Sequence, residues 1–251
     1  MKITGDEYFD QDERFKAVLK RYEEGISSGH VPYMEVDDIV DVADYYNMAG
    51  MEHEADHAAD IGIKMFPGST LPLVFKARRC LQRGDLFTAE AYAGEIEDKT
   101  DLDYHFLRAE LILADGRIAE AEKYFVDTYN EQDEELQNDF CIDAAMIYMD
   151  YGLTESAWKW VRMASPDTDR PEFLELKSRL YIIDGNSEMA LPLLERLIEY
   201  YPMSENYWSL LACAQDETGD REGAIQSAQY ALAINPANNS LREFVEENGE
   251  V

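Results

Sequence analysis

The chain has 251 residues, 46% hydrophobic and 30% charged, and 53 acidic against 22 basic residues give a formal net charge of -31. This much apolar material excludes a wholly disordered chain, and no apolar run approaches the ~18 residues that a membrane span needs. A strongly negative field repels phosphates, so we expect no nucleic-acid partner. The N-terminus shows no secretory signal, and three widely spaced cysteines form neither a disulfide framework nor a metal-ligand pair, which predicts a cytoplasmic protein.

Residues 7–29 open the chain as a predicted amphipathic helix. Its apolar side chains recur at helical spacing: Phe9, Phe15, Val18, Leu19 and Tyr22. We expect residues 1–35 to pack, through this helix, on the segment that follows.

A glycine then recurs every 32 to 36 residues, at Gly50, Gly84, Gly116, Gly152, Gly185 and Gly219. The residue five positions later is always alanine: Ala55, Ala89, Ala121, Ala157, Ala190 and Ala224. The residue seven positions earlier is always small: Ala43, Ala77, Ala109, Ala145, Ser178 and Ala212. This period predicts a repeated unit of helix, tight turn and helix, in which glycine ends the first helix in a left-handed conformation and small residues let the two backbones approach closely.

Residues around the glycines indicate where the second helices begin and end. Asp85, Asn186 and Asp220 follow a glycine and are expected to cap the second helix with a side-chain oxygen. A proline stands 17 residues after three of the glycines, at Pro67, Pro202 and Pro236, where it stops the second helix. Pro192 falls inside a predicted helix and should remove a hydrogen bond and bend its first turn.

The segment His53-Glu54-Ala55-Asp56-His57 matches the H-E-x-x-H pattern of zinc metallopeptidases. Two histidines one helical turn apart can share a metal, and the glutamate can serve as general base. Ala55, however, is the small packing residue of the repeat, so the histidines should face the solvated side of the helix. We therefore expect no metal site, no cofactor and no catalytic residues.

Charge is unevenly distributed along the chain. Between Arg21 and Lys64 there are eleven acidic residues and no lysine or arginine, and between Lys123 and Lys159 there are nine and again none. One basic island interrupts the acidic field, at Lys76, Arg78, Arg79 and Arg83. Its favoured role is to neutralise neighbouring acidic helices, and the alternative is to bind an acidic or phosphorylated group of a partner. Residues 131–135 predict a longer, acidic loop between helices.

With these features the chain resembles the tetratricopeptide repeats, most closely in residues 205–238, which contain Trp208, Leu211, Gly219-Asp220, Ala224, Ala231-Leu232 and Asn235-Pro236. The resemblance covers residues 36–238 and is weaker in the middle. It implies an all-α, right-handed α-solenoid of about six helix-turn-helix repeats, with an extra N-terminal helix and a C-terminal capping helix. The expected units are 36–69, 70–101, 102–137, 138–170, 171–204 and 205–238, and residues 239–251 form the cap and tail.

In this family the first helices line a concave groove that binds an extended peptide or a partner helix. Offsets from the glycines place the expected groove residues at Asp44, Phe75, Arg78, Phe106, Glu110, Asp143, Met146 and Arg179. This lining favours a segment with basic and apolar side chains, because carboxylates attract cations while Phe and Met offer apolar contacts. Two alternatives stay open, namely that the polar residues are solvated helix faces and that Met146 belongs to the core. The clamp by which the family binds acidic C-terminal tails needs paired Lys, Arg and Asn, whereas acids stand at those places here.

The sequence therefore predicts a non-enzymatic protein–protein interaction scaffold that binds a basic or apolar protein segment, of unknown oligomeric state. The first alternative is an acidic repeat chaperone for secreted or assembling proteins, similar to the small acidic chaperones of bacterial secretion systems. The second is a zinc metallopeptidase built on His53 and His57.

Overall fold

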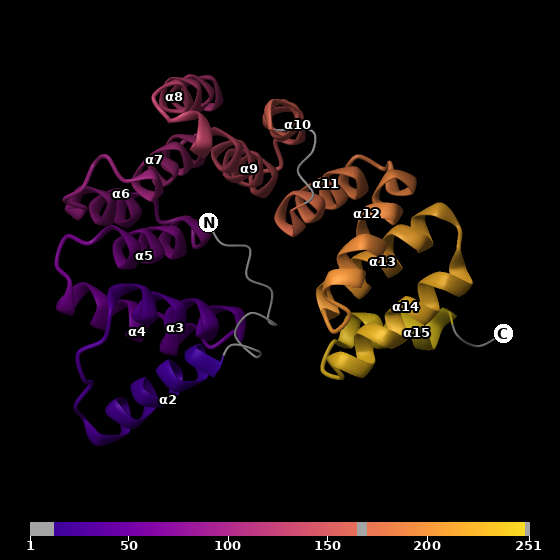
Figure 1. Ribbon diagram of the computed structural model, residues 1–251, viewed down its shortest axis with the longest axis horizontal. Helices are drawn as coiled ribbons and strands as arrows, with labels where there is room; N and C mark the ends of the chain where they lie inside the picture. The colour runs from indigo at the N-terminus through magenta and orange to yellow at the C-terminus, as the bar shows by residue number, and fades with distance from the viewer. Residues whose placement is uncertain (1–12, 165–169, 249–251) are drawn as a thin grey trace. The chain divides into compact units, whose positions relative to one another are not determined.

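A computed structural model describes residues 13–164 and 170–248, and within these ranges all the regular secondary structure is helical (Figure 1). Helix α2 (Glu13–Ser28) precedes six helix pairs, and α15 (Asn239–Asn248) follows them. The pairs are α3 (Val36–Met48) with α4 (Glu52–Met65), α5 (Thr70–Gln82) with α6 (Leu86–Glu95), α7 (Leu102–Ala114) with α8 (Ile118–Asn130), α9 (Glu134–Asp150) with α10 (Thr154–Met163), α11 (Pro171–Ile183) with α12 (Ser187–Tyr200), and α13 (Glu205–Thr218) with α14 (Arg221–Ile234). The predicted all-α helical-repeat class is confirmed. Residues 7–12 of the expected first helix, including Phe9, and residues 249–251 of the tail lie outside the described ranges.

The chain divides into two compact units, Met1–Glu131 and Gln132–Val251. Unit 1 contains α2 to α8 and unit 2 contains α9 to α15. Inside each unit a second helix contacts its own first helix and also the first helix of the next pair, as α4 contacts α5 and α12 contacts α13. Each pair therefore buries its apolar faces against its neighbours, as in a repeat protein.

All six repeat glycines adopt a positive φ, between 69° at Gly152 and 87° at Gly219. In every pair the residue after the glycine donates its N–H to the carbonyl four residues before the glycine, for example Met51 N to Tyr46 O at 2.8 Å and Asp220 N to Gln215 O at 2.9 Å. This bond closes the last turn of the first helix. Because the acceptor is a backbone carbonyl, the turn itself does not require a particular side chain four residues before the glycine, and tyrosine, cysteine, isoleucine and glutamine all occur there.

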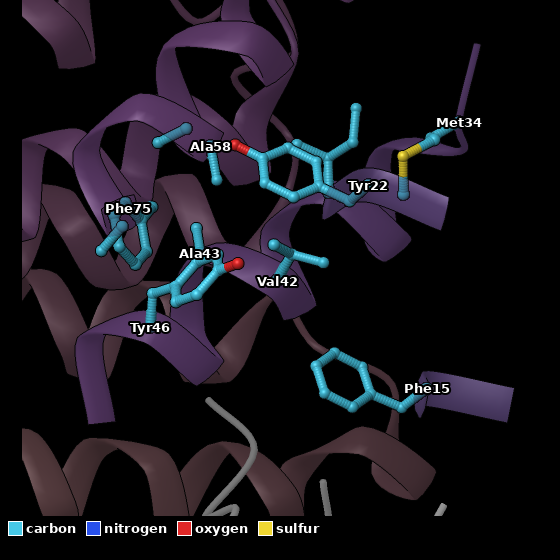
Figure 2. Close-up of a cluster of buried hydrophobic side chains, with 11 residues drawn as sticks. Phe15, Tyr22, Met34, Val42, Ala43, Tyr46, Ala58 and Phe75 are labelled. Atoms are coloured by element: carbon cyan, nitrogen blue, oxygen red, sulfur yellow. The ribbon is translucent and has the colours of Figure 1, made fainter. Parts of the chain in front are cut away.

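The small residues at both fixed offsets are buried. The six alanines after the glycines are 0% exposed, and so are five of the six small residues before them; the sixth, Ala212, is 2% exposed. Larger apolar side chains pack around these positions, as in unit 1, where Phe15 and Tyr22 of α2 share one core cluster with Ala43 and Ala55 (Figure 2). The N-terminal helix thus contributes two aromatic rings to the first core cluster.

The connection between α8 and α9 is not the longer acidic loop that we expected. It comprises only residues 131–133, fewer than the connections 66–69, 96–101 and 201–204. The extra residues lengthen α9 to 17 residues, and Glu134 and Glu135 occupy its first turn. Carboxylates are favourable there because they face the positive end of the helix dipole. The expected boundary between residues 137 and 138 consequently falls inside α9, three to four residues after the helix begins.

One further expectation, on helix capping, is modified by the structure, whereas a helix that continues through Pro192 is what we expected. Asp85 and Asp220 cap their helices through the N–H groups of Thr88 and Gly223, but Asn186 makes no side-chain cap bond. Helix α12 runs from Ser187 to Tyr200 without interruption and includes Pro192.

Leucine in place of Ala224 should lower the free energy of unfolding by about 1–3 kcal/mol, because added methylenes in a close helix contact force side chains and backbone to shift. Ala233→Leu is the matched control, since Ala233 is exposed on the same helix and its replacement should change stability by less than about 0.5 kcal/mol. Urea unfolding followed by circular dichroism measures both, and equal stability of the two variants would contradict the packing assignment.

Two glycine-to-alanine changes should shift stability in opposite directions. Gly84 has a φ of 74° and an added Cβ would meet nothing within 4 Å, so Gly84→Ala should destabilise by about 1–2 kcal/mol through backbone conformation alone. Gly94 lies in α6 with equally open surroundings, so Gly94→Ala should stabilise by up to about 1 kcal/mol. Thermal unfolding of both variants measures the sign of each change in stability. A stabilising effect of Gly84→Ala would refute the left-handed conformation of this turn.

Candidate functional site

Five of the eight expected groove residues occupy one repeat position, six residues before the glycine: Asp44, Arg78, Glu110, Met146 and Arg179. The first three stand on successive first helices of unit 1, α3, α5 and α7. The other two stand on α9 and α11 of unit 2. This repeated position places their side chains in corresponding places along each unit's first helices.

The apolar members of the expected set do not present an open surface. Phe75 is 8% exposed, Phe106 is 3% exposed and Met146 is 6% exposed. Phe75 belongs to the core cluster of Figure 2, and Phe106 packs on Phe125 with ring centroids 6.3 Å apart. These three residues stabilise the fold, because the adjacent helices cover them, and we correct their assignment as docking contacts.

Arg78, a member of both the basic island and the expected groove set, is ion-paired. Its Nε donates to Glu110 Oε1 at 2.8 Å and its Nη2 lies 2.7 Å from the same oxygen. Burial by itself would lower the pKa of Arg78, but Glu110, with Asp103 and Asp44, raises this pKa above its usual value. In unit 1 the shared repeat position therefore holds a carboxylate, a guanidinium and a carboxylate in succession.

In unit 2 the same position offers Arg179 no such partner. The corresponding residue of the next first helix is Cys213, so Arg179 Nε instead lies 3.6 Å from Glu175 of its own helix and its side chain is 41% exposed. Glu175 is buried and accepts a hydrogen bond from Tyr207 Oη at 3.0 Å. Burial raises the pKa of Glu175, although Arg179 and the bond from Tyr207 oppose the shift. Asp143, like Asp44, is half-buried.

The basic island is fully engaged in ion pairs inside unit 1. Lys76 Nζ lies 3.0 Å from Asp60 and 3.3 Å from Asp56 of α4, and Arg83 Nη2 lies 2.9 Å from Asp56. Arg79, only 5% exposed, pairs with Glu52 and Asp56 at 3.1 Å each and donates to Asn47 of α3. Neutralisation of neighbouring acidic helices, the favoured role, is therefore what the structure shows.

Sequence reasoning missed that Arg79 holds this network together. A signal was present, because the residue five before the glycine is otherwise apolar: Tyr45, Leu111, Ile147, Leu180 and Ala214. A charged residue at a core position of a repeat predicts a buried ion pair, since an unpaired buried charge costs too much free energy to keep.

The three defining side chains of the H-E-x-x-H segment take no part in this network, although Asp56 between them does. His53, Glu54 and His57 are exposed, while Ala55 is buried and Asp56 turns toward α5. Within residues 13–164 and 170–248, no group of three His, Cys, Asp or Glu side chains is arranged to hold a metal ion.

The three cysteines are free thiols, and they differ in exposure. Cys141 is buried and Cys80 half-buried, as expected of structural thiols, and burial raises the pKa of Cys141 to about 11. Cys213 is exposed, although it too lies on a first helix, where a buried or half-buried thiol is the usual case.

The ion-pair network predicts a pH-dependent contribution to stability. Burial would raise the pKa of Asp56, but hydrogen bonds from Arg83 and Arg79 outweigh it and lower this pKa from 3.8 to about 2. The folded chain thus holds the carboxylate in its charged form more strongly than the unfolded chain does. Asp56 should stabilise the fold above about pH 4, and this contribution should vanish as the pH falls toward 2.

Asp56→Asn should accordingly lower the free energy of unfolding by about 2 kcal/mol at pH 7, and the difference from the wild type should shrink below pH 4. Glu54→Gln, an exposed change on the same helix, is the control and should differ little from the wild type at any pH. Denaturant unfolding between pH 2.5 and pH 7 measures the three proteins. A difference for Asp56→Asn that is constant over this range would refute the assignment.

Comparison with known proteins finds a likeness of fold. No protein-family model and no curated protein matches the chain. Among solved structures, a tetratricopeptide repeat protein from Parabacteroides merdae superimposes with a TM-score of 0.57 and 11% identity, over 95% of this chain and 100% of that one. The Cut9-Hcn1 hetero-tetramer of the APC/C superimposes with a TM-score of 0.52 and 13% identity, over 94% of this chain and 46% of that one.

The structure adds one finding about membranes, for the described ranges alone: no helix there combines the length and the apolar character that crossing a bilayer requires. The likeness of fold to these two structures accords with the helix pairs of the described residues. The chain has a tetratricopeptide-repeat fold.

Proposed function

We propose that the protein is a non-enzymatic interaction scaffold whose first helices bind a protein segment with basic and apolar side chains. The fold supports a binding role, because tetratricopeptide-repeat structures include assembly subunits such as the Cut9-Hcn1 hetero-tetramer. Free thiols support a reducing, cytoplasmic location for the complex.

The observation that carries the proposal is that all four basic residues of the island form ion pairs within the chain. Lys76, Arg78, Arg79 and Arg83 all pair with carboxylates of α4 or α7. These four cations are thus paired within unit 1, and the chain as a whole has a formal net charge of -31. Such a field attracts cationic segments and raises their rate of encounter.

Open carboxylates remain on first helices of both units. Asp37 in the first turn of α3 and Asp216 near the end of α13 are exposed. Half-buried Asp44, Asp143 and Arg179 stay in the proposed contact set, whereas the three buried apolar residues leave it. Apolar contact is instead offered by Met48 and Ile183, each two residues before a glycine, which are 38% and 56% exposed.

Binding of a labelled peptide of alternating lysine and leucine, followed by fluorescence anisotropy, tests the proposal. The wild type should bind this peptide more tightly than a glutamate–leucine peptide, and the preference should weaken as salt screens the charges. Asp37→Lys should weaken binding about threefold more than Glu54→Lys, because Asp37 lies on a first helix and attraction between charges falls with distance.

Glu54→Lys is a matched control. Both residues are exposed acids in the first turn of a helix in the same pair, and both changes add two positive charges. Equal weakening by the two variants would show that binding depends on net charge alone, and would refute a binding surface on the first helices. A wild type that binds neither peptide would refute the proposed function.

A further inference from the structure

Unit 2 carries a stacked pair of aromatic rings that no part of the proposed groove uses. Trp208 of α13 and Tyr230 of α14 stack with ring centroids 4.6 Å apart and an interplanar angle of 29°. The two helices are adjacent in Figure 1. Trp208 Nε1 donates to the Pro202 carbonyl at 2.8 Å, which fixes the indole, while Tyr230 is 48% exposed. The indole of Trp208 is therefore held in place, whereas the ring of Tyr230 is open to solvent.

A carboxylate stands one helical turn from the indole. Glu205 precedes Trp208 by three residues, a spacing that puts two side chains next to each other on a helix surface. Its Oε1 accepts hydrogen bonds from Ser209 Oγ at 2.9 Å and from Asn238 Nδ2, beyond the end of α14, at 2.6 Å. Both bonds hold the carboxyl group at the junction of α13 and α14, and neither uses Oε2.

In the described ranges, the two rings of the stacked pair carry no basic side chain of this chain. Elsewhere in the described ranges aromatic rings carry basic side chains of this chain: Lys99 lies over Tyr104 and Lys177 over Phe173. No such cation lies over Trp208 or Tyr230 in those ranges. Between Arg196 and Arg242 the sequence contains one basic residue, Arg221, and six acids: Glu199, Glu205, Asp216, Glu217, Asp220 and Glu222.

We infer that Tyr230, Trp208 and Glu205 form a binding site for an arginine side chain of a partner protein. The negative faces of aromatic rings attract a cation, and a planar guanidinium can stack on the exposed tyrosine while it donates hydrogen bonds to a carboxylate. Charge complementarity selects this occupant over an apolar one, because the site joins aromatic faces to a carboxylate in an acidic region. The inference rests on the proposed function, which supplies a partner protein with basic side chains. It adds a binding site that lies outside the expected groove residues.

Binding of two labelled peptides to the full chain tests the site. One peptide alternates arginine and leucine, and the other replaces arginine by citrulline, which keeps the shape and loses the charge. The wild type should bind the arginine peptide at least about tenfold more tightly. Tyr230→Leu and Glu205→Gln should each weaken binding of the arginine peptide about fivefold and leave binding of the citrulline peptide unchanged.

Two control variants separate the site from general effects. Tyr230→Phe keeps the aromatic face and should bind as the wild type does. Tyr33→Leu removes a tyrosine that is 64% exposed in unit 1 and should also leave binding unchanged. Thermal unfolding of each variant establishes that it is folded at the assay temperature.

The outcomes distinguish this inference from the proposed function. Wild-type binding of arginine and citrulline peptides with equal affinity would show apolar contact and overturn the cation site. Unchanged arginine-peptide binding in both Tyr230→Leu and Glu205→Gln would overturn it as well, while weakening by Asp37→Lys in the same assay would leave the proposed function standing. No binding of either the lysine–leucine or the arginine–leucine peptide would overturn both.

Discussion

Close approach of paired helices at small residues is the constraint on which the rest of the structure depends. The alanine five residues after each glycine is completely buried in all six pairs. A larger side chain there would separate the helices, and the left-handed turn at the glycine would no longer bring the second helix back along the first. The turn bond itself allows different side chains four residues before the glycines, because those positions supply a backbone carbonyl to the turn.

The distribution of charge follows from this packing. A repeat position that is apolar in five pairs is occupied by Arg79 in the sixth, and the buried guanidinium requires acceptors from α3 and α4. Lys76 and Arg83 also pair with α4, and Arg78 pairs with Glu110 of α7, so the basic island is engaged in ion pairs inside unit 1. The chain as a whole keeps a formal net charge of -31, and this charge is the physical basis on which we propose a cationic partner.

The two units use the same repeat position differently. In unit 1, Arg78 is held between carboxylates of adjacent first helices, so this part of the surface is already paired. In unit 2, Cys213 stands where Arg179 would need an acid, and the guanidinium remains 41% exposed. The same repeat position thus holds an ion-paired arginine in unit 1 and a partly exposed arginine in unit 2. The difference arises because the residue at this position of the next first helix is an acid in unit 1 and a cysteine in unit 2.

The period of glycines and small residues was sufficient to predict the helix pairs, the left-handed turns and the burial of the alanines, because these depend on backbone conformation and residue size within one unit. The outward direction of His53 and His57 followed from the same logic. The sequence did not determine which groove residues are covered: Phe75, Phe106 and Met146 were expected at a binding surface and are buried. Their exposure depends on contacts between successive pairs, as do the pairing of Arg78 with Glu110 and the stacking of Trp208 on Tyr230. Residues 32 or 22 positions apart meet only when the helices pack, so tertiary structure alone decided these contacts.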